Sequence, residues 1–246
     1  MKQGIYTIQQ HQKLAKDVYL MELGGDTSAI TAPGQFVNIL LEGKYLRRPI
    51  SICDWNEASL TLIYKVVGQG TAQMREMKPG TQLDLLTGLG NGFTVSKSGQ
   101  KPLLAGGGVG VPPLFGLAKA LIMAGKQPVV ALGFASKEDV FAADEFRAIG
   151  CPVAVATVDG SFGTKGFVTN LLGQKEIAGY DYYYSCGPIP MLKALYDACP
   201  TDGQLSFEER MGCGFGACMG CSCKTKYGSK RICKDGPVLE KEEIIW

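Results

Sequence analysis

In residues 1–98, short runs rich in β-branched and aromatic side chains alternate with turn-forming residues. The runs predict β-strands at residues 5–8, 36–41 and 60–67. Between them, Gly24-Gly25-Asp26 and Ala32-Pro33-Gly34-Gln35 are typical of turns. Short strands at this spacing predict an antiparallel β-barrel or a sandwich.

Near residue 100 the pattern changes to short apolar runs that alternate with amphipathic stretches of helical length. The apolar runs predict strands at residues 102–105, 129–134, 153–158 and 182–186. The stretches between and after them predict helices at residues 112–124, 140–148, 166–172 and 191–198. Strands that alternate with helices indicate a parallel sheet with Rossmann-like connections. Beyond about residue 206, glycine and cysteine dominate and no regular element is predicted.

The 246 residues are enough for two modest domains and an appendage. We therefore predict an α+β multidomain protein: a β-barrel over residues 1–98, an α/β domain over residues 99–205 and a small C-terminal segment over residues 206–246. The formal net charge of +2 gives no basic surface for nucleic acid. The sequence shows no signal peptide and no apolar run that would span a bilayer, so we expect a cytoplasmic protein with no membrane role of its own.

Five of the nine cysteines lie close together near the C-terminus. Cys213, Cys218, Cys221 and Cys233 fit the spacing C-x4-C-x2-C…C, which is typical of plant-type [2Fe–2S] clusters. Glycines between them allow the tight loop that brings thiolates to two irons. A structural zinc site is the alternative, although zinc motifs usually have two short knuckles. Cys223 is the fifth thiol, and we interpret it as free, with an alternative ligand as the other interpretation.

A second motif follows the predicted strand at residues 102–105. Gly106, Gly107, Gly108 and Gly110 precede a helix, so that the backbone can approach a pyrophosphate. Pro112 stands where the third glycine of G-x-G-x-x-G would be, which predicts a variant of the dinucleotide fold. A plain tight turn is the alternative interpretation.

In the β-rich region, Arg47 and Arg48 precede Ser51. An arginine can bind a diphosphate through two hydrogen bonds, and a serine hydroxyl can bond a flavin ring nitrogen. Taken alone, this segment is only a strand with exposed arginines.

These motifs occur in the order found in the ferredoxin–NADP reductase superfamily, which the whole chain resembles. Arg48-Pro49-Ile50-Ser51 resembles the flavin signature Arg-x-Tyr-Ser, with Ile50 in place of tyrosine. Gly68-Gln69-Gly70-Thr71 is similar to the phosphate-contacting turn, the loop from Gly106 to Pro113 to the nucleotide loop, and Cys186-Gly187-Pro188 to the nicotinamide-side motif.

The C-terminal segment narrows the resemblance to the electron-transfer subunits of dihydroorotate dehydrogenase B, through Glu208-Glu209-Arg210-Met211, the cysteines and Asp235-Gly236-Pro237. The resemblance implies FAD, one [2Fe–2S] cluster, and NAD as a diffusible substrate. It also implies a partner FMN subunit that oxidises dihydroorotate in pyrimidine biosynthesis, in a heterotetramer with two copies of each. The FAD contacts implied are Arg48, Pro49, Ile50, Ser51, Ile63, Tyr64, Lys65, Gly70 and Thr71.

Two alternatives stay open at this point. One is an NAD(P)H-linked flavin and iron–sulfur subunit of another complex, of the glutamate synthase, sulfite reductase or hydrogenase type. The other is a zinc-stabilised binding module without enzymatic activity. Ser136-Lys137 leaves NAD and NADP undecided, whereas the resemblance implies NAD.

The sequence offers no catalytic dyad, and hydride transfer needs no protein acid or base. His11, the only histidine, is expected to be solvated, as is the acidic stretch at residues 240–243. The aromatic run at residues 182–184 is expected to be core strand. Trp246 either anchors a partner or belongs to a frayed end.

Overall fold

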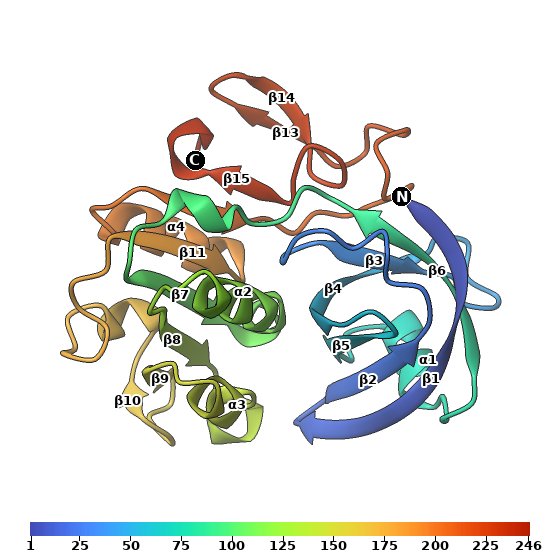
Figure 1. Ribbon diagram of the computed structural model, residues 1–246, viewed down its shortest axis with the longest axis horizontal. Helices are drawn as coiled ribbons and strands as arrows, with labels where there is room; N and C mark the ends of the chain where they lie inside the picture. The colour runs from blue at the N-terminus through green and yellow to red at the C-terminus, as the bar shows by residue number, and fades with distance from the viewer.

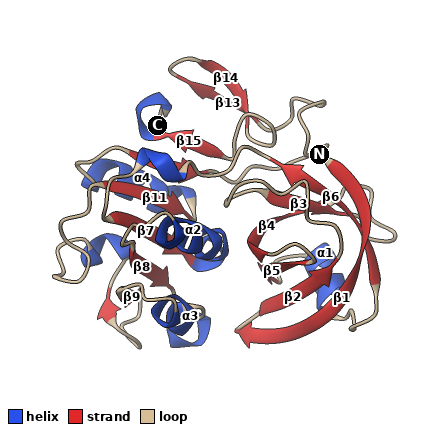
Figure 2. Ribbon diagram, viewed as in Figure 1, coloured by secondary structure: helices blue, strands red, loops and turns tan.

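The computed structural model describes residues 1–246, and its N-terminal part is a closed antiparallel barrel in the strand order β1-β2-β5-β4-β3-β6. The strands are β1 (Lys2–Ala15), β2 (Val18–Gly24), β3 (Phe36–Ile39), β4 (Arg48–Trp55), β5 (Ser59–Lys65) and β6 (Gln82–Leu89). The barrel prediction is confirmed, and the sandwich alternative is wrong. One short helix, α1 (Gln69–Arg75), follows β5 where only a turn was predicted. Figure 2 shows that the barrel is otherwise almost entirely strand.

The second part is a seven-stranded sheet in the order β10-β9-β8-β7-β11-β12-β15. Its strands from β10 to β12 are parallel, and β15 is antiparallel to β12. The strands are β7 (Pro102–Gly107), β8 (Val129–Phe134), β9 (Val153–Thr157), β10 (Thr164–Lys165), β11 (Tyr182–Cys186), β12 (Gly203–Ser206) and β15 (Val238–Glu240). Helices α2 (Pro112–Met123), α3 (Ala143–Ala148) and α4 (Ile189–Ala198) complete this part, so the predicted Rossmann-like domain is confirmed.

Two predicted helices differ from the observed elements. The one expected at residues 140–148 begins only at Ala143, because Val140 is extended and Ala142 has a left-handed backbone with φ of 62°. The one expected at residues 166–172 is a single 3-10 turn, η4 (Val168–Leu171), because Gly166 has φ of 130° and cannot join a helix.

The C-terminal segment is more regular than predicted. It contains the hairpin β13 (Ser222–Thr225) and β14 (Gly228–Arg231), then β15, then the 3-10 turn η5 (Lys241–Glu243). Figure 1 shows this segment running across the top of both the barrel and the sheet.

The acidic stretch at residues 240–243 is not the solvated face that was expected. Glu243 is buried and forms an ion pair with Lys230. Glu240 accepts hydrogen bonds from Tyr182 Oη at 3.1 Å and Gln204 Nε2 at 2.8 Å.

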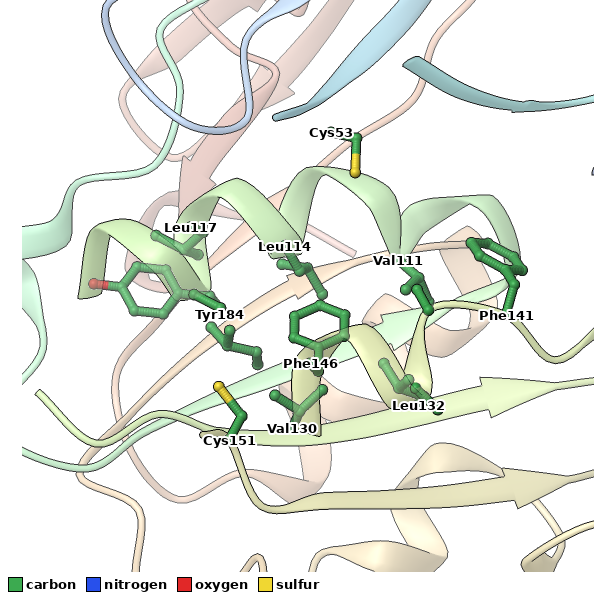
Figure 3. Close-up of a cluster of buried hydrophobic side chains, with 14 of the residues drawn as sticks. Cys53, Val111, Leu114, Leu117, Val130, Leu132, Phe141, Phe146, Cys151 and Tyr184 are labelled. Atoms are coloured by element: carbon green, nitrogen blue, oxygen red, sulfur yellow. The ribbon is translucent and has the colours of Figure 1, made fainter. Parts of the chain in front are cut away.

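One hydrophobic core joins the barrel to the sheet. Cys53 and Ile63 of the barrel pack in the same buried cluster as Leu114 and Leu117 of α2. Figure 3 shows Cys53 on one side of α2 and Phe146 on the other, among the side chains that cover the sheet. Lys119 of α2 also donates to Asp54 of β4 at 2.6 Å. The junction between the two parts is therefore a packed interface, and the predicted limits at residues 98 and 205 stay predictions.

The remaining expectations had different outcomes. Tyr182–Tyr184 are buried in β11, as predicted. His11 is not simply solvated, since its Nδ1 lies 2.9 Å from Met77 O and its Nε2 lies 2.9 Å from Tyr64 Oη. Trp246 is not frayed, because its ring packs against Tyr196 and Phe207 with centroids 5.7 Å away in each case. None of the helices is both long and apolar enough to cross a membrane.

Candidate functional site

The larger cavity, of about 500 Å³, opens at the carboxyl ends of β7, β8 and β9. Ligands of open parallel sheets bind at this edge, where loops leave the strands. The predicted residues Gly107, Gly108, Lys65 and Pro188 line it. It also includes residues that the sequence interpretation missed, namely Phe134, Asp139, Val158, Phe167 and Met191. The arrangement suits an extended ligand that has apolar rings and a phosphate group.

The glycine loop touches the Cys-Gly-Pro motif directly. A β-carbon at position 110 would lie 2.2 Å from Cys186 O and 2.5 Å from Gly187 N, so no side chain fits there. Two motifs about 75 residues apart in the sequence are thus in van der Waals contact through bare backbone, as expected for a loop that lets a ligand approach closely.

A second cavity, of about 230 Å³, lies between the barrel and the sheet. Pro49 and Ser51 of β4 line one side, and Gly110, Cys186 and Gly187 line another. The carboxylate-bearing Glu208 and Glu209 also line it, although they were not among the predicted site residues. Their place in the chain could have indicated it, because they follow shortly after the carboxyl end of β12, at the sheet edge where sites form.

Cys186 lines this second cavity, and its thiol is a neutral group. Burial raises its pKa to about 12, with the nearby carboxylate of Glu208 adding to the rise and a hydrogen bond from Ser206 opposing it. At neutral pH the thiol therefore keeps its proton, and it is not a nucleophile.

Arg48 lies against the start of α1. A β-carbon at Gly70 would be 2.3 Å from Arg48 Nε, so the guanidinium fills the space that the glycine leaves open. Arg48 makes no ion pair with a carboxylate of the chain. Such a cation beside helix N–H groups suits a diphosphate. The Thr71 hydroxyl, in contrast, already accepts from Val67 N at 3.0 Å and caps its own helix.

The other predicted flavin contacts are divided between the surface and the core. Lys65 forms an ion pair with Asp139 at 3.3 Å, which connects β5 to the sheet beside the larger cavity. Ile63 and Tyr64 are buried in the protein's own cores. A flavin could reach only the backbone of these two residues. Ile50 is half-buried on β4 and packs against the barrel core, and Gly106 is buried at the end of β7.

The four predicted cluster ligands lie as two pairs. Cys218 N donates to Cys213 Sγ at 3.5 Å, and Cys233 N donates to Cys221 Sγ at 3.4 Å. Burial raises the pKa of the Cys213 thiol, but backbone N–H groups, that of Cys218 foremost, lower it by more, to about 6. Burial first and the neighbouring Cys221 second raise the pKa of Cys233 to about 12.

This donor set fits a two-iron cluster. A two-iron cluster takes two thiolates on each iron, and the two pairs of cysteines supply them. Ala217 N also donates to Cys213 Sγ at 3.2 Å, the kind of contact that stabilises thiolate sulfur. Cys223 lies on β13, outside both pairs.

Two polar residues, Arg231 and Asn91, hold the cysteine-bearing C-terminal segment in place. Arg231 donates to Gly216 O at 2.9 Å and pairs with Asp235 at 3.0 Å. Asn91, on the loop after β6, donates to Val238 O at 2.8 Å and accepts from Val238 N at 3.1 Å. The loop is thereby fastened to the barrel.

Comparisons with known proteins agree with this geometry. A family model described as the iron-sulfur cluster binding domain of dihydroorotate dehydrogenase B matches residues 208–245. Over its whole length the chain is 44% identical to the dihydroorotate dehydrogenase B (NAD(+)) electron transfer subunit of Geobacillus sp., covering 99% of that protein. It is 46% identical to the subunit of the same name from Fusobacterium nucleatum subsp. nucleatum, covering 97% of this chain and 96% of that one.

Among solved structures, a similar chain belongs to an NADH-dependent reduced ferredoxin-NADP oxidoreductase studied for flavin-based electron bifurcation. The two chains superpose with a TM-score of 0.88 and are 31% identical, over 99% of this chain and 90% of the other. The fold resemblance to the ferredoxin–NADP reductase superfamily is thereby confirmed, and the matched C-terminal model describes an iron–sulfur domain rather than a zinc domain.

Proposed function

This chain belongs to the family of electron transfer subunits of NAD(+)-dependent dihydroorotate dehydrogenase B, and on that basis we propose that it passes electrons between a catalytic subunit and NAD. The observation that carries the proposal is structural. A nucleotide-sized cavity, a barrel-side cavity and two pairs of cysteines occur together in one chain, and these are the parts that a relay needs.

Residues of the barrel would hold FAD. Arg48, unpaired by any carboxylate and packed on Gly70, would bind the diphosphate. Pro49 and Ser51 would border the flavin ring in the second cavity, beside Cys186 and Gly187. When bound, FAD exchanges a hydride with NAD, and a [2Fe–2S] cluster carries single electrons.

The remaining residues of the site would orient the nicotinamide and exclude water. Val109 and Pro188 line both cavities, so a nicotinamide would pass beside them from the larger cavity into the smaller one. The Cys186 thiol, which keeps its proton, presents a neutral and weakly polar surface at the point where a hydride would move. Phe207 and Met211 give that cavity an apolar wall, which keeps water away from the reacting atoms.

At the other end, Cys213, Cys218, Cys221 and Cys233 would hold the cluster. Their two-pair arrangement and the N–H groups directed at Cys213 Sγ suit thiolates bound to iron. Cys223 would stay a free thiol.

We further propose an FMN-containing catalytic subunit as the partner, in a heterotetramer with two copies of each chain. The pathway would be pyrimidine biosynthesis, because orotate is the product of the named relatives' complex. The compartment would be the cytoplasm, since nine free cysteines suit a reducing environment.

The main alternative is a flavin and iron–sulfur subunit that serves another complex. The solved structure at 31% identity is of an NADH-dependent reduced ferredoxin-NADP oxidoreductase, which carries another activity in its name. We favour the dihydroorotate partner because identity to the named electron transfer subunits is higher, at 44% and 46%.

The test begins with an anaerobic visible spectrum of the purified chain, which should show flavin bands and a [2Fe–2S] signature. Reconstitution with the FMN subunit should then give dihydroorotate-dependent reduction of NAD. A colourless protein that contains zinc would refute the relay. A coloured protein that reduces dyes with NADH, yet never couples to dihydroorotate, would refute only the choice of partner.

A further inference from the structure

Asn38 occupies an unusual place for its residue type. It lies in the middle of β3, it is only 1% exposed, and asparagine is depleted in strands. Its neighbours Val37 and Ile39 point into the barrel core, so Asn38 points outward with Phe36. Figure 1 shows that this side of the barrel faces the C-terminal segment.

The side chain of Asn38 contacts the cysteine loop at its first predicted ligand. Asn38 Nδ2 donates to Cys213 O at 3.2 Å. The next residue of the loop is equally close, because a β-carbon at Gly214 would lie 2.3 Å from the same nitrogen. The amide therefore sets how near the backbone of Cys213 and Gly214 comes to the barrel.

The other half of the amide has no partner. Asn38 Oδ1 is buried and accepts no hydrogen bond. An unsatisfied buried polar atom destabilises a fold, and a leucine of similar size would suit a buried strand position better. Stability therefore does not explain why asparagine stands here, whereas the contact with Cys213 does.

The same strand pair borders the proposed flavin site. Asn38 lies directly opposite Pro49 in the β3–β4 ladder, as Phe36 lies opposite Ser51. Phe36, Pro49 and Ser51 all line the second cavity. Residues opposite each other in a ladder share a face, so one face carries both the wall of this cavity and the contact to Cys213.

We propose that Asn38 is a positioning residue for the iron–sulfur site, which holds the Cys213 backbone against the flavin-bearing strands of the barrel. The inference rests on the proposed function, because it assumes that Cys213 is a cluster ligand. It concerns a residue of the barrel, far in sequence from every cysteine of the segment. Asn38 orients the ligand itself. Replacing Asn38 should therefore change the cluster and not merely the docking of the segment.

The structure offers a matched control in Asn91. This residue also fastens the C-terminal segment to the barrel, through the backbone of Asp235 and Val238, but it contacts none of the predicted ligands. Asn91→Ala should therefore loosen the segment without acting on Cys213. The comparison separates positioning of a ligand from simple docking.

The experiment uses the flavin- and cluster-loaded chain with the variants Asn38→Leu, Asn38→Ser and Asn91→Ala. Cluster release to a chelator is followed by visible absorbance, and the reduced cluster is examined by electron paramagnetic resonance. We expect both Asn38 variants to release the cluster about 10- to 100-fold faster and to change its resonance spectrum, as loss of an outer-shell partner does. Asn91→Ala should keep the wild-type spectrum. Asn38→Ser keeps the test valid should Asn38→Leu fail to fold.

Melting temperatures are also measured in a Cys213→Ser background. There none of the variants should bind the cluster, so differences in melting temperature cannot arise from it. There Asn38→Leu should not lower the melting temperature, whereas Asn91→Ala should. Wild-type release rates and spectra in both Asn38 variants would overturn the inference alone, as would equal effects of Asn38→Leu and Asn91→Ala on the cluster. A wild-type chain that takes up no cluster would overturn the proposed function and this inference with it.

Discussion

Replacing Gly110 by alanine tests whether the contact between the glycine loop and the Cys-Gly-Pro motif shapes the reacting site. The added β-carbon would lie 2.2 Å from Cys186 O and 2.5 Å from Gly187 N. Non-bonded heavy atoms settle at about 3.5 Å, so the two backbones must separate by about 1 Å. Both neighbouring atoms are backbone, and no side-chain rotation can relieve the overlap.

The expected magnitude follows from this displacement. Overpacking of this kind costs about 1–3 kcal/mol, which lowers the melting temperature of a chain of this size by about 2–12 °C. The functional effect should be larger, because a displacement of about 1 Å at a reacting site costs about 10²-fold in rate. The change should appear in hydride transfer from NADH to flavin more than in flavin retention. Arg48 and Gly70, where the flavin diphosphate would bind, belong to the barrel and not to the glycine loop.

Stopped-flow measurement of flavin reduction by NADH, together with flavin content and melting temperature, checks the prediction. Gly173→Ala is the matched control, because a β-carbon there meets nothing within 4 Å and the backbone is not left-handed. A Gly110→Ala protein that is reduced by NADH at the wild-type rate would refute the close-contact reasoning. An equal loss in Gly173→Ala would show that the effect is not specific to the site.

Three further predictions test other parts of the molecule. Cys213→Ser should abolish the [2Fe–2S] spectrum and the iron content while flavin and NADH-dependent dye reduction persist; joint loss of both activities would contradict separate cofactor sites. Arg48→Ala should raise the dissociation constant for FAD about 10- to 100-fold, because hydrogen bonds to charged groups contribute about 1.5–3 kcal/mol, with Arg48→Lys intermediate; unchanged flavin titrations would exclude Arg48 as the diphosphate ligand. The hydrogen bond from Arg47 holds the pKa of Asp84 below its ordinary value, so the pair stabilises the fold above the unfolded carboxyl pKa of about 3.9, and this contribution disappears as the pH falls through the lower folded pKa. Arg47→Met should therefore flatten the acid side of the curve of unfolding free energy against pH, measured by urea denaturation, and an unchanged slope would show that the pair contributes nothing.

Much of the fold could be predicted because local sequence patterns specify its strands and helices. The strands at residues 129–134 and 182–186 have the bounds predicted from their apolar runs. The strand Gln82–Leu89 was missed, although its buried and exposed positions alternate along almost its whole length. The alternation was obscured in the sequence, because Leu86 takes a partly exposed position and Thr87 a buried one. Helix α1 was missed because glycine and threonine at its start favour a turn.

The sequence by itself determined the cofactor classes and predicted residues that would hold them. Cysteine spacing, a glycine loop after a strand and an arginine before a serine are short-range features, and a few residues suffice to state them. They predicted the [2Fe–2S] site at Cys213, Cys218, Cys221 and Cys233. They could not say which thiols pair, because spacing along the chain does not specify directions in space.

Only the tertiary structure decided how these pieces meet. It divided the cysteines into two pairs, brought Glu208 and Cys186 to the same cavity, and buried Asn38 against Cys213 from 175 positions away. It also added β15 to the parallel sheet, so that the C-terminal segment covers both domains. The physical reason is that such contacts arise from the closure of the barrel and the order of the sheet strands. Those long-range pairings leave no periodic trace in the sequence, and hence the residues that connect the flavin side to the cluster became visible only when the chain was folded.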